Sequence, residues 1–163
     1  MPRTLILLRH AKAEHPMTID DRQRSLADRG VREAAEAGDW LRENAPKVDK
    51  VLCSPAARTR QTLETAEILA PAEFPSALYM GGEDDYLEQV KETDAEAQTL
   101  LVIGHEPTVS GTAIALAADK DSELALEIRH GYPTSGIAVL TFHGEWDALR
   151  WNSANITAFR APR

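Results

Sequence analysis

The chain has 163 residues, and 43% of them are hydrophobic, which predicts one domain, residues 1–163, with a sizeable core. Its 18 Lys and Arg residues against 26 Asp and Glu residues give a formal net charge of −8, which disfavours nonspecific binding to nucleic acid or to anionic membranes. The chain has one cysteine, Cys53, which excludes a disulfide framework and a cysteine-rich zinc module and favours a reducing, cytoplasmic setting.

The chain begins with an apolar run that is followed by a long helix-favouring segment. The run at residues 4–8 (TLILL) predicts a strand buried on both faces, and it is too short for a membrane span or a signal-peptide core. Ser25 and Asp28 are typical of a capping pair for a helix that reaches Asn44. The expected inner face of this helix comprises Val31, Ala34, Ala35, Gly38 and Leu41.

The middle of the chain continues the alternation of strands and helices. Ser54 and Pro55 are typical of a helix start, with Ser as the N-cap and Pro as the first helical residue. The elements expected here are a buried strand at residues 50–53, a helix from Ser54 to about Leu69, a weak strand at residues 77–80 and a helix at residues 83–91.

The last third of the chain changes character after one more strand and helix. The expected elements are a strand at residues 100–103 (LLVI), a helix from Pro107 to about Ala118, and strands at residues 124–128, 136–142 and 145–151. Turns around Pro133 and Gly144 link the last three without helices, so we expect them at the far edge of the sheet. The whole pattern predicts a three-layer α/β/α sandwich with a mostly parallel central sheet.

Polar residues follow the predicted strands at one edge of this sheet, where α/β proteins bind ligands. Arg9 and His10 follow the first strand, Ser54 follows the second with Arg58 one helical turn later, and His105 follows the strand at residues 100–103. Guanidinium groups match phosphate oxygens, and helix starts add positive charge, so this edge should bind a phosphoryl group. A histidine there can attack phosphorus and form a covalent phosphohistidine, which water then cleaves.

Three segments, in order, resemble the signatures of the histidine phosphatase, or phosphoglycerate mutase-like, superfamily. They are residues 8–13 (LRHAKA), residues 54–62 (SPAARTRQT) and residues 104–107 (GHEP). The small size of the chain, Arg24-Ser25-Leu26 with Gly30, and residues 132–136 (YPTSG) resemble the SixA-type phosphohistidine phosphatase branch. The resemblance covers nearly the whole chain and implies a phosphoglycerate mutase-like fold.

The resemblance also implies roles for individual residues. It makes His10 the phosphoryl acceptor, Arg9 and Arg58 the phosphate clamps, His105 the second pocket histidine, and Arg24 and Ser54 further substrate-binding residues. Relatives work without a metal or an organic cofactor, and the arginines here supply the positive charge that Mg²⁺ would otherwise bring. We therefore expect no cofactor and activity in the presence of a chelator.

The sequence departs from the superfamily pattern at two places. Ala11 stands where much of the superfamily has Gly, although a small residue is common in the SixA-type branch. Many relatives carry a glutamate general acid after the third strand, where this chain reads LYMGG at residues 78–82. Glu83 and Asp84 are the nearby carboxylates, and His105 is a further candidate proton donor.

A weak or absent general acid favours a substrate with a labile bond to phosphorus. Phosphohistidine has such a P–N bond, so the expected activity is hydrolysis of phosphohistidine on a protein, with inorganic phosphate as the product. One alternative is a broad-specificity phosphomonoesterase acting on small molecules. Another is a noncatalytic phosphate-binding module, which would not require the nucleophilic imidazole of His10.

Other motifs carry less weight. Arg129-His130-Gly131 copies the superfamily's first motif, but no later partner segments follow it, so we expect it at the end of an edge strand. Cys53 lacks the arginine spacing of a cysteine-dependent phosphatase and is expected to be a buried strand thiol. No two of the five histidines lie three or four residues apart, which disfavours a zinc site.

Overall fold

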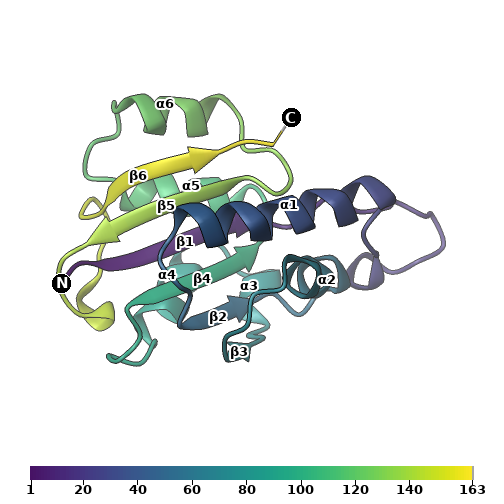
Figure 1. Cartoon of the computed structure of the whole chain (residues 1–163), viewed down its shortest axis with the longest axis horizontal. Coiled ribbons are helices and arrows are strands. Elements are labelled where there is room, and N and C mark those ends of the chain that lie inside the picture. Colours follow the sequence, from purple (N-terminus) through teal and green to yellow (C-terminus); the bar gives the residue numbers. More distant parts are fainter. Residues whose placement is uncertain (163) are drawn as a thin grey trace.

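The computed structural model describes residues 1–162, whose strands form a six-stranded mixed sheet in the order β3-β2-β4-β1-β5-β6 (Figure 1). The parallel part consists of β3 (Ala72–Glu73), β2 (Lys50–Cys53), β4 (Thr99–Gly104) and β1 (Arg3–Arg9). On the other side of β1, β5 (Ile137–Phe142) and β6 (Asn155–Arg160) complete the sheet with antiparallel pairings.

Helices cover both faces of the sheet, as Figure 1 shows. The helices are α1 (Asp28–Asn44), α2 (Ala57–Ala66), α3 (Ala77–Met80), α4 (Glu83–Lys91), α5 (Thr108–Leu116) and α6 (Glu123–His130). Two short 3-10 helices, η1 (Asp21–Gln23) and η2 (Trp146–Ala148), lie in the connections. The predicted three-layer α/β/α arrangement with a mostly parallel sheet is confirmed, since three of the five strand pairings are parallel.

Successive residues of the central strands supply two separate hydrophobic cores. Leu5 and Leu7 of β1 pack with α4, α5 and α6, whereas Ile6 and Leu8 pack on the face covered by α1 and α2. All four side chains are at most 1% exposed. Burial on both faces explains why the strand sequences are continuously apolar rather than alternating. Within residues 1–162, no helix combines the length and the apolar character needed to cross a membrane.

Two of the strands expected from the sequence are helices or turns in the structure. Residues 77–80 form α3, and the third strand along the chain is instead the two-residue β3. In α3 only Leu78 is buried, and Met80 is 79% exposed. Residues two positions apart would share one face of a strand, whereas in a helix they point in different directions. Residues 145–151 were expected to be a strand and instead contain η2, which buries Trp146 against the Ala97 carbonyl.

Residues 124–128 were also expected to be a strand but belong to α6. Ser122 caps this helix by accepting a 3.1 Å hydrogen bond from the Ala125 backbone N–H. Ala125 and Ile128, three residues apart, form its buried face, which is helical spacing rather than strand alternation. The sequence prediction therefore placed Arg129-His130-Gly131 wrongly at a strand end, because these residues end α6.

One strand and two helices also differ from the sequence prediction. Strand β6 was not predicted, because its residues are partly exposed and carry no continuous apolar run. Helix α1 begins at Asp28 without a side-chain cap from Ser25. Val31, which is 46% exposed, and Ala35, which is also exposed, lie outside the inner face on which they were expected. Helix α2 begins at Ala57, two residues after the expected start, and ends at Ala66 because Glu67 adopts a left-handed conformation.

Helices α1 and α2 touch at a position where only glycine fits. A Cβ at Gly38 would fall within the backbone of Ala66, much closer than real Cβ contacts. Arg42, one turn along α1, donates a 2.8 Å hydrogen bond to the Ala66 carbonyl. This contact fixes the position of α2, and with it the position of Arg58 near the N-terminus of α2.

Gly38→Ala should therefore destabilise the protein, although alanine favours helix over glycine by up to about 1 kcal/mol. Forcing the two backbones apart should lower the free energy of unfolding by about 1–3 kcal/mol, measured by urea denaturation. Glu43→Ala, at an exposed position of the same helix, should change it by no more than about 0.5 kcal/mol. An unchanged or raised stability of Gly38→Ala would contradict the close contact.

Candidate active site

The parallel pairing of β1 with β4 brings the two predicted pocket histidines together. Arg9 lies opposite Gly104 in the register, so His10 and His105 leave the sheet side by side. The His10 backbone N–H donates a 3.1 Å hydrogen bond to the Gly104 carbonyl. The two imidazole rings have centroids 5.3 Å apart, close enough to act on one ligand atom.

The imidazole of His10 is held in one tautomer. Its Nδ1 lies 2.7 Å from the Ala11 carbonyl oxygen, which can only accept a hydrogen bond. Nδ1 therefore carries the proton and Nε2 keeps its lone pair. Burial of the ring is the main reason that the pKa of His10 falls to about 4. The positive charges of Arg58 and Arg9 add to this effect, and the hydrogen bond to Ala11 opposes it. At neutral pH Nε2 is therefore unprotonated and keeps its lone pair.

The backbone around His10 is braced from two sides. The Ala11 backbone N–H donates a 3.0 Å hydrogen bond to the Thr62 hydroxyl of α2. The Ser135 backbone N–H is shared between the carbonyls of Arg9 and His10, at 3.1 Å from each. The methyl group of Ala11 is buried against Leu26 and Ala34, so alanine at this position fills space rather than disturbing the turn.

His105 is oriented by Ser54, which lies fully buried behind it. Its Nε2 is 2.7 Å from the Ser54 hydroxyl oxygen. That hydroxyl has no other acceptor in residues 1–162, so it donates to Nε2 and leaves the ring proton on Nδ1. Nδ1 is itself buried without a partner. Burial lowers the pKa of His105 to about 3, helped by Arg58, so the ring is neutral and presents a free N–H donor.

Arg9 and Arg58 bring two guanidinium groups close to the two histidines. Arg9 donates through Nη1 to the Tyr132 carbonyl at 2.8 Å, and Arg58 donates through Nη1 to the Asp21 carbonyl at 2.8 Å. The Nε–H groups of both arginines are buried and have no partner among residues 1–162. Burial lowers the pKa of Arg9, yet a guanidinium remains charged. Buried cations with free donors form an anion-binding site.

Arg24 is near this pocket and is held by an aspartate that the sequence analysis missed. The Asp21 carboxylate pairs with Arg24 at 2.9 Å and with Arg58 at 3.1 Å, and it accepts a 2.7 Å hydrogen bond from the Tyr79 hydroxyl. The Tyr79 hydroxyl, followed by Arg24, holds the pKa of Asp21 well below its usual range. An acid three residues before an expected pocket arginine was the available signal.

The two carboxylates named as general-acid candidates do not join this network. Glu83 and Asp84 lie in the first turn of α4, and neither bonds to His10 or His105 within residues 1–162. The Glu83 carboxylate lies against Gly111 of α5, where a Cβ would collide with it. The segment in which relatives carry glutamate instead contributes Tyr79, whose ring meets His105 edge-on at 5.6 Å.

The competing sequence motifs lie outside the pocket. Cys53 is completely buried, and burial raises the pKa of its thiol to about 12, so it is not a nucleophile at neutral pH. His130 is exposed at the end of α6. The described part of the chain, residues 1–162, contains no group of three or more His, Cys, Asp or Glu side chains placed to hold a metal ion.

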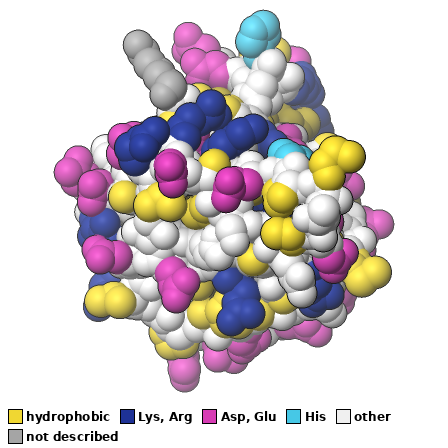
Figure 2. All heavy atoms as spheres, turned by 90° about the vertical axis from the view of Figure 1, so that its right-hand side faces the viewer, with side chains coloured by type: hydrophobic (Ala, Val, Ile, Leu, Met, Phe, Trp, Pro, Cys, Tyr) yellow, Lys and Arg dark blue, Asp and Glu magenta, His cyan; other side chains and the backbone are white. Residues whose placement is uncertain are grey.

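The surface at the carboxyl ends of the strands carries clustered positive charge. Figure 2 shows this side of the molecule, where several Lys and Arg side chains gather near a histidine in the upper half. This local charge contrasts with the net charge of −8 of the whole chain. A positive patch on an acidic protein directs anions to one place on its surface.

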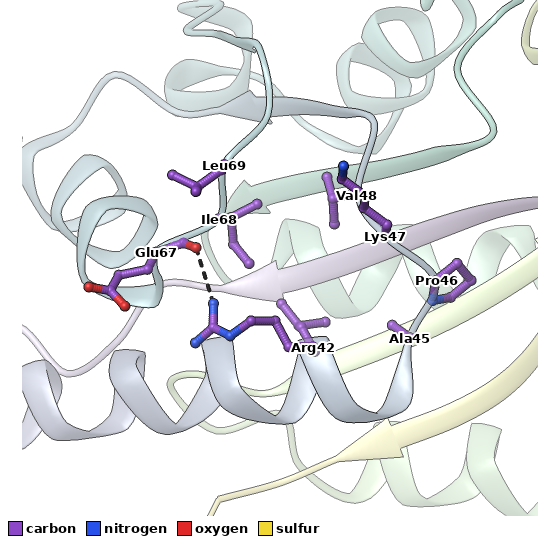
Figure 3. Close-up of a pocket in the computed structure, with 9 residues that line it drawn as sticks. Arg42, Ala45, Pro46, Lys47, Val48, Glu67, Ile68 and Leu69 are labelled. Atoms are coloured by element: carbon purple, nitrogen blue, oxygen red, sulfur yellow. Dashed lines mark hydrogen bonds between the residues drawn. The ribbon is translucent and has the colours of Figure 1, made fainter.

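An apolar groove lies at the other end of the sheet. It encloses about 270 Å³ between the ends of α1 and α2 and is lined by Leu41, Val48, Ile68 and neighbouring residues (Figure 3). Val48 comes just before β2, whereas Ser54 directly follows it. The groove therefore lies at the amino ends of the parallel strands, and the histidines lie at their carboxyl ends. None of the predicted site residues lines this groove.

Comparison with known proteins identifies the family. A model of the histidine phosphatase superfamily (branch 1) matches residues 5–74. Uncharacterized proteins of Mycobacterium leprae and Mycobacterium tuberculosis are 44% and 46% identical over 161 and 158 residues, covering 96% of this chain and all of each relative.

Solved structures extend the match over the whole fold. A proposed phosphohistidine phosphatase SixA from Nakamurella multipartitia is 39% identical, with a TM-score of 0.92 over 99% of this chain and 97% of that one. Its proposed counterpart from Agrobacterium tumefaciens is 30% identical, with a TM-score of 0.82 over 99% of both chains. The protein histidine phosphatase SixA complexed with tungstate, 22% identical, shares the fold with a TM-score of 0.78 over 96% of this chain and 95% of that one. The chain therefore belongs to the histidine phosphatase superfamily.

Proposed function

We propose that this phosphatase hydrolyses phosphohistidine on proteins through a covalent phosphohistidine intermediate on His10, without a metal or an organic cofactor. The observation that carries the proposal is the free Nε2 of a neutral, buried His10 that has the guanidinium groups of Arg9 and Arg58 close to it. Two relatives at 30% identity or more are themselves described as proposed phosphohistidine phosphatases, which supports the same substrate class here.

In the first step, the Nε2 lone pair of His10 forms a bond to phosphorus while the bond to the leaving nitrogen breaks. We assign the guanidinium groups of Arg9 and Arg58 and the Nδ1–H of His105 as the donors for the transferring oxygens, because all three side chains lie close to His10. Donors fixed before the reaction stabilise developing charge without reorganising. The Ala11 carbonyl stabilises His10 as positive charge develops on its ring.

In the second step, water attacks the phosphorus of phosphorylated His10 and releases inorganic phosphate. The same arginine and His105 donors face the phosphoryl group in both steps, because neither histidine backbone needs to move. The arginines provide the positive charge that a metal ion supplies in other phosphoryl-transfer sites. This is the physical basis for expecting full activity in a chelator.

The substrate class follows from the leaving group and from access to the pocket. No carboxylic acid with a raised pKa adjoins His10 within residues 1–162, which suits a leaving group that does not need a proton from the enzyme. The segment between Gly81 and Thr99 contains only α4 and short turns, so this segment provides no large lid for the site. An open pocket suits a side chain presented by another protein.

The decisive assay measures phosphate release in excess EDTA from a phosphohistidine protein, from p-nitrophenyl phosphate and from several sugar phosphates. Wild type should prefer phosphohistidine, and His10→Ala should lower turnover at least about 10³-fold while orthophosphate still binds. Preference for a small ester would instead favour a broad phosphomonoesterase. Activity that survives His10→Ala would refute the covalent mechanism.

Arg58→Lys tests the role of the planar guanidinium. A lysine keeps the charge but loses the fork, so kcat/KM for phosphohistidine should fall by about 10- to 100-fold. Arg60→Lys is the matched control, because Arg60 is exposed on the same helix, 5.5 Å from the ring of Phe74. Equal losses in the two variants would mean that only the general charge of α2 matters.

The protonation state of His10 can be read by ¹⁵N NMR of the imidazole rings, assigned with His10→Gln. The His10 signals should show a proton on Nδ1 and none on Nε2 at neutral pH, with the midpoint of protonation near pH 4. Because this folded-state pKa is lower than that of an unfolded histidine, about 6.5, stability should fall as the pH drops from 6.5 to 4. A midpoint at 6.5 or above would contradict the assignment.

A further inference from the structure

Asp21 has a position that the catalytic steps above do not explain. It is a carboxylate beside two arginines at a site built for anions, bonded to Arg58, Arg24 and the Tyr79 hydroxyl. Its negative charge must weaken the binding of any phosphoryl group. A carboxylate that weakens the binding of every phosphorylated substrate can still favour one of them, if it interacts favourably with another part of that substrate.

Asp21 is far more exposed than the histidine that we propose as the nucleophile. The nucleophile His10 is only 8% exposed, whereas the Asp21 side chain is 50% exposed. In-line displacement sends the leaving group away from the nucleophile, here toward solvent. Asp21 on η1 and Tyr79 on α3 border this opening, and Tyr79 also packs against His105.

Phosphohistidine and phosphate esters differ in the charge of the group that leaves. When the P–N bond of a phosphohistidine with a protonated ring breaks, the electron pair returns to the nitrogen and neutralises the positive ring. The departing imidazole then needs no proton. When a P–O ester bond breaks, the electron pair leaves on oxygen, which must carry negative charge or take up a proton. An ionised carboxylate favours the first leaving group and repels the second.

We propose that Asp21 is a specificity-determining residue, whose exposed carboxylate selects substrates with a positively charged leaving group over phosphate esters, whose leaving oxygen departs with negative charge. The inference rests on the proposed attack by His10. Arg58, Arg24 and Tyr79 fix the carboxylate in place. Arg22, which lies 5.1 Å over the Tyr79 ring, and Asp20 are further charged groups near Tyr79. The phosphoryl group can take donors from Arg58, which leaves Asp21 to face the leaving group.

The test compares two small probes, phosphoramidate, whose nitrogen carries its own proton, and p-nitrophenyl phosphate, whose leaving group is anionic. The measured quantity is the ratio of their kcat/KM values, in which the amount of folded enzyme cancels. Asp21→Asn should lower kcat/KM for phosphoramidate and raise it for the ester, so that the ratio falls about tenfold or more.

Asp20→Asn is the matched control, because it removes the same charge from an exposed neighbour whose side chain makes no hydrogen bond or ion pair within residues 1–162. This control should leave the ratio unchanged. The proposal is overturned if Asp21→Asn changes both rate constants by the same factor, which would indicate only arginine positioning, or if Asp20→Asn shifts the ratio equally.

The same experiment separates this inference from the proposed function. Wild type that fails on a phosphohistidine protein but hydrolyses both small probes would refute the protein substrate, and the ratio would still test Asp21. Wild type that hydrolyses neither probe and also fails on the phosphohistidine protein would overturn both proposals. A repeat with a phosphohistidine peptide should show the same loss in Asp21→Asn as phosphoramidate does.

Discussion

The parallel hydrogen bonding between β1 and β4 determines where every group of the pocket lies. With Arg9 opposite Gly104, the chain leaves both strands at the same height, and a backbone hydrogen bond from His10 to Gly104 continues the ladder by one residue. Both strands are buried on both faces, so neither can shift its register without exposing apolar side chains. The distance between the two imidazole rings is thus set by the hydrophobic core.

Burial and positive charge act together on the two histidines. Removing an imidazole from water disfavours its charged form, and the neighbouring guanidinium groups add repulsion. The protein thereby maintains cationic arginines next to neutral histidines at the same pH. This combination provides attraction for an anion and a free electron pair for its phosphorus, and it depends on keeping water away from the rings.

The sequence was informative where one strong physical signal dominated. The uninterrupted apolar runs at residues 4–8 and 100–103 could be read as buried strands, and the polar residues after them fell at one end of the sheet. Prediction failed for residues 124–128, where a short amphipathic segment fits both a strand and a helix until Ser122 is seen to cap it. It also failed for the half-exposed edge strand β6.

Some residues of the site could be located from the sequence, and others only from the structure. Residues that follow strands directly, such as His10 and His105, could be located from the sequence. Asp21 could not, because it reaches Arg58 and Tyr79 from a 3-10 turn whose path depends on tertiary contacts. The fully buried position of Ser54 behind His105 likewise required the structure, since a residue at a helix start usually faces solvent.

Helix α2 performs two tasks with one face. Arg58 points into the pocket, and Thr62, one turn later, holds the backbone of Ala11 beside the nucleophile. A helix turns by about 100° per residue, so adding or deleting one residue between Arg58 and Thr62 would turn one of these side chains away from the site. The left-handed residue Glu67 ends the helix, and the chain beyond it is free of this constraint. Length variation in this region of the fold is therefore expected after Glu67, in the segment leading to β3, and not within α2.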